Sequence, residues 1–296
     1  MHKSSKIWLA KVLLIMANQI HWFPGHMSKA LKGVEEKIKI IDVVIELFDA
    51  RAPLSSVNPQ LENLIKNKKK LVILTKADIA DPVETKKWVD ELSKRYDSLL
   101  TLNLTDGNST SVITKAVSKL GTEKWAKDKA RGMKPQPLKT MIVGIPNVGK
   151  SSLINRFAKR KAAGVQNKPG YTRGEQWIKV SNEFILLDTP GILPMSYDDK
   201  KKATNLALIG SIREDILPNN ELVHSLLTYL KDNYPNALKD RFSIEEIGTD
   251  LEVLEAICEV RKVVNSNGEK DILRAEQLLL KEFKEGKLGR ITLEKL

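Results

Sequence analysis

The sequence is poor in the residues that build cross-links and metal clusters. Its 296 residues include one cysteine, Cys258, and four histidines. One cysteine cannot form a disulfide within the chain, and it leaves no cysteine cluster to hold structural zinc. The histidines lie at scattered positions and form no metal-binding pattern. A disulfide scaffold and a cysteine-based zinc module are therefore excluded, and the composition fits a reducing cytoplasm.

The sequence also lacks a hydrophobic run long enough to cross a membrane. The apolar stretch of residues 7–17 is interrupted by a lysine and is shorter than the roughly 20 residues that a bilayer span requires. We therefore expect no membrane partner and a cytoplasmic location. Residues 1–18 form an N-terminal extension, and no acidic residue occurs before Glu35. Two interpretations stay open: residues 1–15 are an organellar targeting presequence, or the true start is Met16.

Positive charge is concentrated in the first two thirds of the chain. The net charge is +12; residues 1–199 carry 33 Lys and Arg against 20 Asp and Glu, and residues 200–296 carry 16 against 17. A basic surface favours polyanionic partners such as RNA. Lysine-rich surfaces also serve solubility alone, so the charge by itself does not establish a nucleic-acid partner.

Apolar strand patterns alternate with helical patterns up to about residue 195. This alternation predicts an α/β domain over residues 19–195, with a mostly parallel sheet flanked by helices. Residues 121–138 are basic and contain two prolines, and we expect an exposed linker there. The expected strands are residues 42–48, 71–74, 99–104, 139–143, 176–180 and 184–187, and the expected helices are residues 27–40, 59–67, 82–96, 109–120 and 150–159.

The sequence after residue 195 has the periodicity of helices alone, which predicts a C-terminal all-helical domain over residues 196–296. Ser243 and Glu246 have the spacing of a capping box at a helix N-terminus, and Gly286 is a suitable helix end. The expected helices are residues 203–216, 219–232, 243–264 and 269–285.

Residues 144–151 match the phosphate-binding loop Gly-x-x-x-x-Gly-Lys-Ser, with an expected strand before them and an expected helix after them. The glycines let backbone N–H groups turn toward phosphate oxygens, assisted by the helix N-terminus. We expect Lys150 to reach the β- and γ-phosphates and to assist catalysis, and Ser151 to bind Mg²⁺. The expected phosphate-binding residues of this loop are Asn147, Val148, Gly149, Lys150, Ser151 and Ser152.

Two further segments complete a triphosphate site. Residues 188–191 read Asp-Thr-Pro-Gly and follow an apolar strand. In phosphate-loop proteins an Asp here holds Mg²⁺, and the Gly N–H meets the γ-phosphate, which assigns these roles to Asp188 and Gly191. Thr172 is expected to bind Mg²⁺ in a switch loop that orders with the triphosphate; an ordinary loop threonine is the alternative.

Residues 75–78, Thr-Lys-Ala-Asp, match the guanine-reading motif that usually begins with Asn. The Asp78 carboxylate can accept from both the ring N–H and the exocyclic amine of guanine, a donor pair that adenine lacks. The stem of Lys76 can cover the base. Thr75 replaces the usual Asn, so one polar contact is open.

The order of these motifs differs from that in ordinary GTPases, where the phosphate loop comes first. Here the guanine motif precedes it by about 70 residues. A parallel sheet tolerates such a permutation, because the site requires proximity in space and not in sequence. The motifs thus predict a circularly permuted P-loop GTPase. Residues 103–107 occupy the place of the fifth, base-supporting loop, but they match its pattern poorly.

The chain resembles the circularly permuted ribosome-assembly GTPases of the YlqF type, also called ribosome biogenesis GTPase A. The resemblance runs from about residue 19 to the C-terminus, and it departs from the family in residues 1–16, in Thr75 and in the fifth loop. The segments that carry it are residues 21–27 (His-Trp-Phe-Pro-Gly-His-Met), 49–56 (Asp-Ala-Arg-Ala-Pro-Leu-Ser-Ser), 75–78, 144–151, 169–173 (Pro-Gly-Tyr-Thr-Arg), 188–191 and 286–290.

The resemblance implies a GTPase that matures the large ribosomal subunit, with a helical domain that contacts RNA. It assigns catalysis to His26, which can orient or deprotonate water near neutral pH; a structural histidine is the equal alternative. It also implies that Asn147 helps to bind an activating K⁺, with a loop-stabilising Asn as the alternative. GTP binding is then expected to favour a ribosome-bound state, and hydrolysis to release it.

Hydrolysis by the chain alone is expected to be slow. Many GTPases have a water-orienting Gln directly after the glycine that corresponds to Gly191. In this sequence Gly191 is followed by Ile192 and Leu193. Stimulation by ribosomal particles is therefore expected. Arg51 and Arg173 are candidates for an arginine finger or an RNA contact, with a solvated surface role as the alternative.

The expected partners are GTP, GDP, Mg²⁺, K⁺ and the rRNA and proteins of the large subunit, with a monomer off the ribosome. Two other functions stay open. One is a small-subunit assembly GTPase, although the zinc module or OB barrel that related permuted families carry is not indicated by the sequence. The other is a non-enzymatic RNA-binding module that uses nucleotide as a structural ligand, which the missing Gln favours.

Overall fold

The structure, a computed structural model, describes residues 20–21, 25–104, 106–162, 177–187, 189, 191–193, 196–197, 199–212 and 217–296. These residues form two compact units. One unit comprises Pro24–Leu193 and the terminal residues Glu294–Leu296. The other comprises Pro194–Leu293 with the short strand β1 (Ile20–His21).

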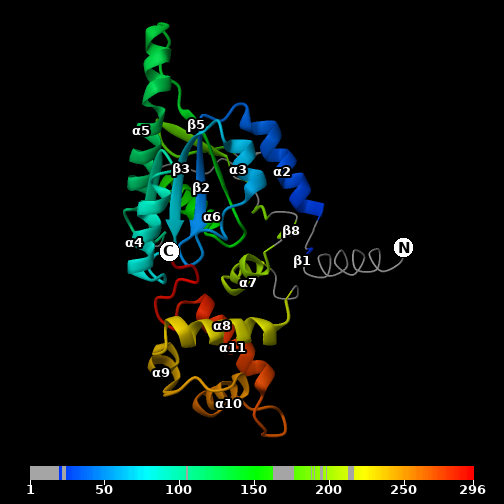
Figure 1. Cartoon of the computed structure of the whole chain (residues 1–296). Coiled ribbons are helices and arrows are strands. Elements are labelled where there is room, and N and C mark those ends of the chain that lie inside the picture. The colour runs from blue at the N-terminus through cyan, green and yellow to red at the C-terminus, as the bar shows by residue number, and fades with distance from the viewer. Residues whose placement is uncertain are drawn as a thin grey trace, which may run out of the picture. The chain divides into compact units, whose positions relative to one another are not determined.

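The first unit is built on a six-stranded sheet with the order β4-β3-β2-β5-β7-β6. Strands β2, β3 and β5 of this sheet are labelled in Figure 1. Neighbouring strands run parallel except β6 and β7, which pair antiparallel. The predicted mostly parallel sheet is therefore confirmed. Its strands are β2 (Val43–Asp49), β3 (Lys69–Thr75), β4 (Ser98–Thr101), β5 (Leu138–Gly144), β6 (Trp177–Lys179) and β7 (Phe184–Leu187).

Strand β2 lies between β3 and β5 and sets the position of the site. All of its residues are buried, as expected for a central parallel strand covered on both faces. Asp49 at its end pairs with Thr75 of β3, and Leu47 pairs with Gly144 of β5. The carboxyl ends of three strands therefore meet side by side at one edge of the sheet.

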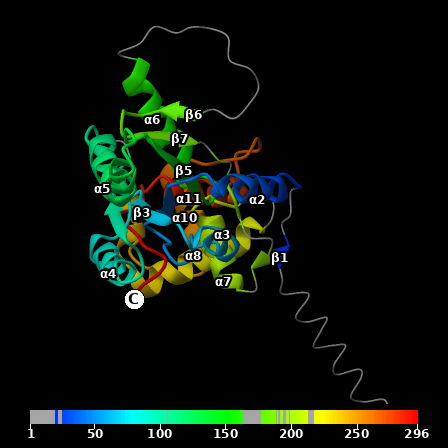
Figure 2. The same ribbon diagram turned by 90° about the horizontal axis from the view of Figure 1, so that it is seen from above.

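Helices cover both faces of this sheet. Apolar residues of α2 and α3 pack with Val44, and Trp88 of α4 belongs to one apolar cluster with Phe48, so these three helices share a face. Helix α5 contacts β2, β3 and β4, and Figure 2 shows α5 and α4 on opposite sides of β3. The helices are α2 (Gly25–Ile38), α3 (Pro59–Ile65), α4 (Pro82–Leu92), α5 (Ser109–Ala130) and α6 (Lys150–Ala162).

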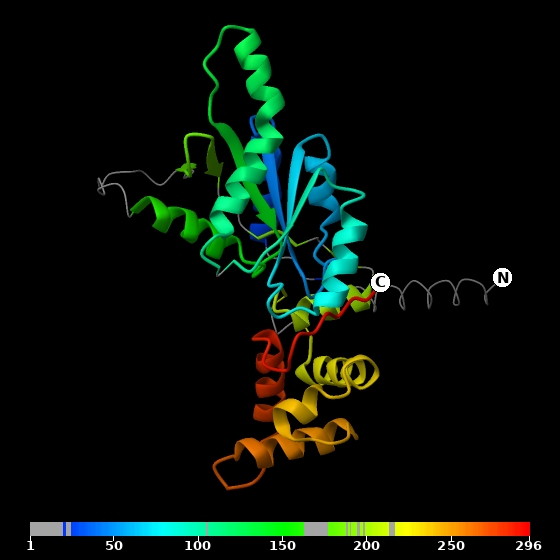
Figure 3. The same cartoon turned by 90° about the vertical axis from the view of Figure 1, so that its left-hand side faces the viewer.

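The prediction of a linker over residues 121–138 is wrong for its first half. Helix α5 continues to Ala130, and its last turns extend beyond the sheet (Figure 3). Glu, Lys and Ala, which favour helices, make up much of this segment, and Glu123 pairs with Lys127 one turn later at 2.7 Å. The two prolines that suggested a linker lie after the helix, in the segment that returns to β5.

Glu46, in the middle of β2, is a carboxyl group buried in the sheet. Its side chain is 1% exposed, and its Oε2 has no hydrogen-bond partner among the described residues. Burial, and next the charge of Glu62, raises the pKa of Glu46 to about 8, against the opposing effect of Lys70. The folded protein therefore holds a proton here at neutral pH.

We expect Glu46→Gln to remove a pH dependence of stability. The unfolded chain releases the Glu46 proton near pH 4.5, whereas the folded state keeps it up to about pH 8. The folded state thus loses stability as the pH rises through this window, by on the order of 4 kcal/mol. Urea unfolding of both proteins at pH 5 and pH 8 measures the difference. Parallel losses in wild type and variant would contradict the assignment.

The second unit is helical, as expected, apart from the short antiparallel pair of β1 with β8. Leu226, Ile257 and Phe283 are buried in its core. The expected capping box at Ser243 is wrong, because Ser243 ends a helix in the left-handed region and Thr249 forms the capping box instead. The elements are β8 (Ser196–Tyr197), α7 (Lys200–Leu208), α8 (Asn219–Asn233), α9 (Ala237–Phe242), α10 (Asp250–Arg261) and α11 (Ile272–Lys284).

None of the described helices combines the length and the apolar character that a membrane span needs. Helix α11 ends at Lys284 and is followed by Gly286 with a φ of 72°, so the expected helix end at this glycine is confirmed.

Candidate nucleotide-binding site

The phosphate loop connects β5 to α6 at the edge where three strands end. Its start requires glycine, because Gly144 has a φ of 150° and a Cβ there would lie 2.8 Å from Leu47 O. Asn147 and Gly149 also have positive φ values, of 57° and 110°. These conformations turn the chain sharply into α6, whose first N–H groups lack partners within the helix. The predicted loop thus has the backbone shape that cradles anions.

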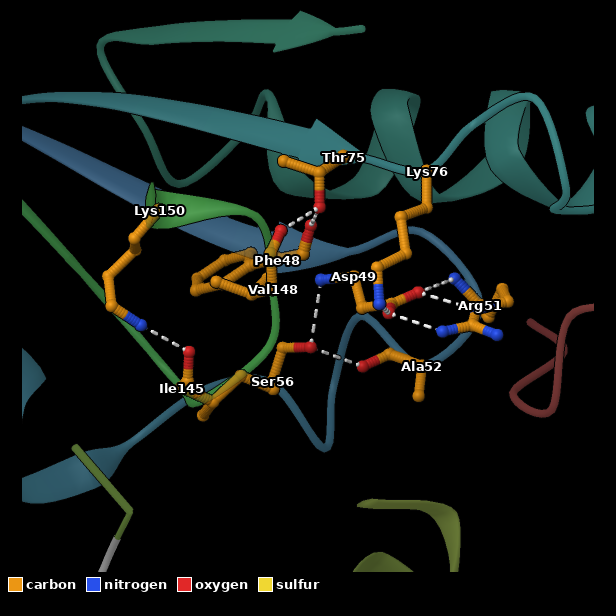
Figure 4. Close-up of polar contacts among 10 residues, drawn as sticks. All are labelled: Phe48, Asp49, Arg51, Ala52, Ser56, Thr75, Lys76, Ile145, Val148 and Lys150. Atoms are coloured by element: carbon orange, nitrogen blue, oxygen red, sulfur yellow. Dashed lines mark hydrogen bonds and ion pairs between the residues drawn. The ribbon is translucent and has the colours of Figure 1, made fainter. Parts of the chain in front are cut away.

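Lys150, the first residue of α6, is held over this loop. Its Nζ donates to Gly144 O at 3.1 Å. It also donates to Ile145 O at 2.5 Å, as Figure 4 shows. Its side chain is buried within the loop, whereas Ser151 and Ser152 are exposed at the first turn of α6. An ammonium and exposed hydroxyls next to the N–H groups of a helix N-terminus form a site suited to phosphate oxygens.

Gly191 lies against the phosphate loop. A Cβ at this position would come within 2.9 Å of Pro146 Cα and 3.1 Å of Lys150 Nζ. Ile192 N donates to Gly144 O at 3.1 Å, which fixes the segment. Ile192 and Leu193 are buried. The structure therefore brings Gly191 to the phosphate loop and leaves the residues after it in the core.

Thr75 joins the guanine motif to the phosphate loop. Its buried Oγ1 lies 2.7 Å from Val148 O and 3.1 Å from Phe48 O, and it donates its one proton to these carbonyls (Figure 4). An Asn amide would offer two N–H donors to the same carbonyls. The sequence left this contact open, and the structure shows that threonine makes it with a single donor.

A pocket of ≈ 480 Å³ opens beside the phosphate loop and the guanine motif. Its volume falls within the range of small-molecule sites, about 300–1,000 Å³. The structure thus brings Lys76 and Asp78 together with Asn147, Val148 and Gly149. The lining residues are Lys76, Asp78, Ile79, Asn103, Leu104, Asn147, Val148, Gly149, Ser152, Asn155 and Arg156.

Some of these residues were missed by sequence reasoning. Asn103 and Leu104 follow β4, where the sequence located a fifth loop without assigning residues. Arg156 of α6 supports this loop, since its Nη1 donates to Leu104 O at 2.7 Å. The pairing of β4 with β3 places the loop beside the guanine motif, and no local sequence signature indicates it.

The proposed surface role of Arg51 is wrong. Its side chain is 1% exposed, and its guanidinium binds the buried Asp49 carboxylate through Nε at 2.9 Å and Nη2 at 2.8 Å. A guanidinium held in this way is not available as an arginine finger or as an RNA contact. The reason is local: Asp49 stands two residues earlier and would otherwise be a buried charge without a partner.

Several predicted residues lie outside the described part of the chain. They include Thr172, Asp188, Arg173 and the side chain of His26. Thr189, next to Asp188, is described, and its Oγ1 donates to Ile142 O of β5. Among the described residues no group of three or more His, Cys, Asp or Glu side chains is placed to hold a metal ion. Of the expected Mg²⁺ ligands, only Ser151 lies in the described part of the chain.

The fold and its motif-bearing strand ends define the class of the protein. A phosphate loop after β5 and a guanine motif after β3, on a sheet of this order, belong to a P-loop GTPase. The guanine motif comes first in the chain, so the motif order is circularly permuted. Residues 139–253 match the family described as "50S ribosome-binding GTPase".

Known proteins give the particular family. The chain is 42% identical to Ribosome biogenesis GTPase A of Bacillus cereus over 276 residues, which cover 93% of each sequence. A GDP-bound structure of YlqF is 25% identical, with 89% of this chain and 98% of that chain covered and a TM-score of 0.65. A GNP-bound YlqF from Thermotoga maritima is 26% identical, with 90% and 98% covered and a TM-score of 0.64. The chain belongs to the ribosome biogenesis GTPase A family.

Proposed function

We propose that this GTPase is an assembly factor of the large ribosomal subunit. GTP favours its ribosome-bound state, and hydrolysis releases it. The observation that carries the proposal is the meeting of the phosphate loop, Gly191 and the guanine motif at one sheet edge, in a family whose members are named for ribosome biogenesis. The family description "50S ribosome-binding GTPase" supports the choice of subunit.

The phosphates and the guanine base of the nucleotide bind to different parts of the site. Phosphates bind the N–H groups and side chains of residues 147–152 and the N–H of Gly191, with Lys150 on the β- and γ-phosphates. Guanine binds Asp78, with Lys76 beside the base and Thr75 bracing the motif against the phosphate loop. The shared lining of one pocket by Lys76, Asp78 and residues 147–149 supports this division.

Mg²⁺ fits the donor set available here. Ser151 offers an exposed hydroxyl oxygen at the start of α6, and Thr172 and Asp188 add a hydroxyl and a carboxylate. Hard oxygen ligands of this kind are those that Mg²⁺ prefers. The ion would neutralise charge on the phosphates, and Ser151 would hold it next to Lys150.

Activation of water is assigned to His26, and Asn147 is assigned to an activating K⁺. Asn147 supports this by its place: it lines the pocket and turns the phosphate loop with a φ of 57°. The buried Ile192 and Leu193 support the view that a partner must assist GTP hydrolysis, because neither side chain can orient water. Slow turnover alone and stimulation on the ribosome follow.

The two parts of the chain have different tasks in this proposal. Residues 19–195 form the GTPase domain, and residues 196–296 form a helical domain that contacts rRNA. The excess of positive charge in residues 1–199 supports the view that the GTPase domain provides much of the electrostatic attraction to RNA. The protein acts in the cytoplasm and is a monomer off the ribosome.

GTP turnover tests the proposal. It is measured in K⁺ and in Na⁺ buffer, with no particle, with purified large subunits and with small subunits as the matched control, and ATP replaces GTP in a parallel series. We expect large subunits to stimulate GTP turnover at least about tenfold in K⁺, less in Na⁺, with ATP inert.

Each outcome bears on a different part of the proposal. Equal stimulation by small subunits would overturn the choice of the large subunit. Stimulation that is the same in Na⁺ would remove K⁺ from the mechanism. Tight GTP binding without stimulation by either particle would overturn the role as a ribosome-coupled GTPase.

A further inference from the structure

Asp49 ends β2 beside the guanine motif. Its side chain is fully buried, and its register partner on β3 is Thr75, the first residue of the motif. Its Oδ1 accepts from Arg51 N at 3.0 Å and from Nε at 2.9 Å, and its Oδ2 accepts from Nη2 at 2.8 Å (Figure 4). The guanidinium fork therefore satisfies both oxygens of this buried carboxylate.

A second cation reaches the same carboxylate. Lys76 Nζ lies 3.0 Å from Asp49 Oδ2 (Figure 4). The backbone of Lys76 has a φ of 57°, in the left-handed region that residues with a Cβ rarely adopt. Backbone and ammonium thus fix both ends of this side chain, and the residue lines the same pocket as Asp78.

The loop that follows Asp49 is itself held in place. Asp49 N donates to Ser56 Oγ at 3.0 Å, and Ser56 Oγ donates to Ala52 O at 2.8 Å. The carboxylate of Glu294, near the C-terminus, accepts from the backbone N–H groups of Leu54 and Ser55. Asp49 therefore sits at a rigid point of the fold, as a residue that orients another side chain requires.

The charge on Asp49 persists over the working pH range. Burial alone would raise the pKa of its carboxyl, but the charge and hydrogen bonds of Arg51, with Lys76 adding to them, lower it to about 2. The contact with Lys76 is accordingly an ion pair at neutral pH. The lysine side chain is long, and its torsions rotate freely. The ion pair with Asp49 fixes the ammonium and so removes much of this conformational freedom before a ligand binds.

We propose that Asp49 is a positioning residue for guanine recognition: it holds the ammonium of Lys76, so that the stem of this lysine forms a wall for the base that Asp78 reads. The inference rests on the proposed function, because it takes Lys76 and Asp78 as guanine-binding residues. Asp49 acts through Lys76 and not on the base itself. Pre-organisation of this wall increases affinity for guanine nucleotides without a new contact to them.

A double-mutant cycle on the full chain tests the role. The affinity for fluorescent GDP and the melting temperature are measured for wild type, Asp49→Asn, Lys76→Met and the double variant. We expect each single substitution to raise the Kd for GDP about tenfold, and the double variant to bind no more weakly than Lys76→Met alone. A merely structural role of Asp49 would weaken binding in the Lys76→Met background as well.

Two further variants make the cycle decisive. Asp49→Asn leaves the Arg51 guanidinium buried without its counter-charge, so the cycle is repeated with Asp49→Asn/Arg51→Met, which removes both charges. Asp42→Asn is the matched control, because Asp42 precedes the same strand at its other end and pairs with Lys124 at 2.7 Å. Its Kd for GDP is expected to equal that of wild type.

The outcomes separate the inference from the function on which it rests. A wild type that binds ADP as tightly as GDP overturns guanine recognition, whatever the variants do. The positioning role alone is overturned by two results in a protein whose wild type binds GDP selectively. In the first, Asp49→Asn does not raise the Kd for GDP. In the second, Asp49→Asn raises the Kd for GDP in the Lys76→Met background as well.

Discussion

Asp78→Asn is expected to convert the chain from a guanine-binding into a xanthine-binding protein. The Asp78 carboxylate offers only acceptors, which match the ring N–H and the exocyclic amine of guanine. Asparagine replaces one acceptor by an N–H donor, and xanthine replaces the amine by a carbonyl, so the new pair is complementary again. The Kd for GDP should rise about 10²- to 10³-fold, because the exocyclic amine of guanine then faces an N–H donor instead of an acceptor, and the Kd for XDP should fall below the Kd for GDP.

Titration of the variant with GDP, XDP and ADP measures this exchange. Asp81→Asn is the matched control, since Asp81 is close in sequence but caps α4 through Val83 N and Glu84 N. It should bind GDP as wild type does. An Asp78→Asn variant that keeps its GDP affinity, or that gains nothing with XDP, would show that Asp78 does not read the base.

The parts of the site that the sequence predicted are those with a local signature. The phosphate loop and the guanine motif are short patterns that need only a strand before them, and both strands are present. The register of β2 with β3 and β5 then brings them together, which a sequence indicates only through the alternation of strands and helices. The permuted order could be recognised because each motif is recognisable by itself.

The parts that the sequence missed depend on which polar side chains the packed structure buries. Arg51 was expected at the surface, because the nearby Asp49 gives no sign in the sequence that both side chains are buried as an ion pair. Lys76 joins the same carboxylate from the neighbouring strand. Glu46 was part of an apolar strand pattern, and only the packed structure shows that its carboxyl has lost water. Such contacts follow from packing and not from the local pattern.

Gly191→Ala is expected to block the triphosphate state and to leave GDP binding nearly unchanged. The new Cβ would lie 2.9 Å from Pro146 Cα and 3.0 Å from Pro146 N, and the proline ring restricts the backbone that would have to yield. The Gly191 segment therefore shifts away from the phosphate loop. In the proposed site its N–H meets only the γ-phosphate, so the rate of GTP hydrolysis should fall about 10²-fold or more.

Single-turnover hydrolysis, with the Kd values for GDP and for a non-hydrolysable GTP analogue, separates these effects. Gly33→Ala adds the same methyl group in α2, where nothing lies within 4 Å, and should change none of the three quantities. The Kd for the analogue should rise in Gly191→Ala while that for GDP stays within about threefold. Equal losses for both nucleotides would mean that the methyl group distorts the whole phosphate loop, and an unchanged rate would remove Gly191 from the γ-phosphate site. A selective loss would tie Gly191 to the triphosphate, because only a nucleotide with a γ-phosphate depends on the N–H of Gly191 in the proposed site.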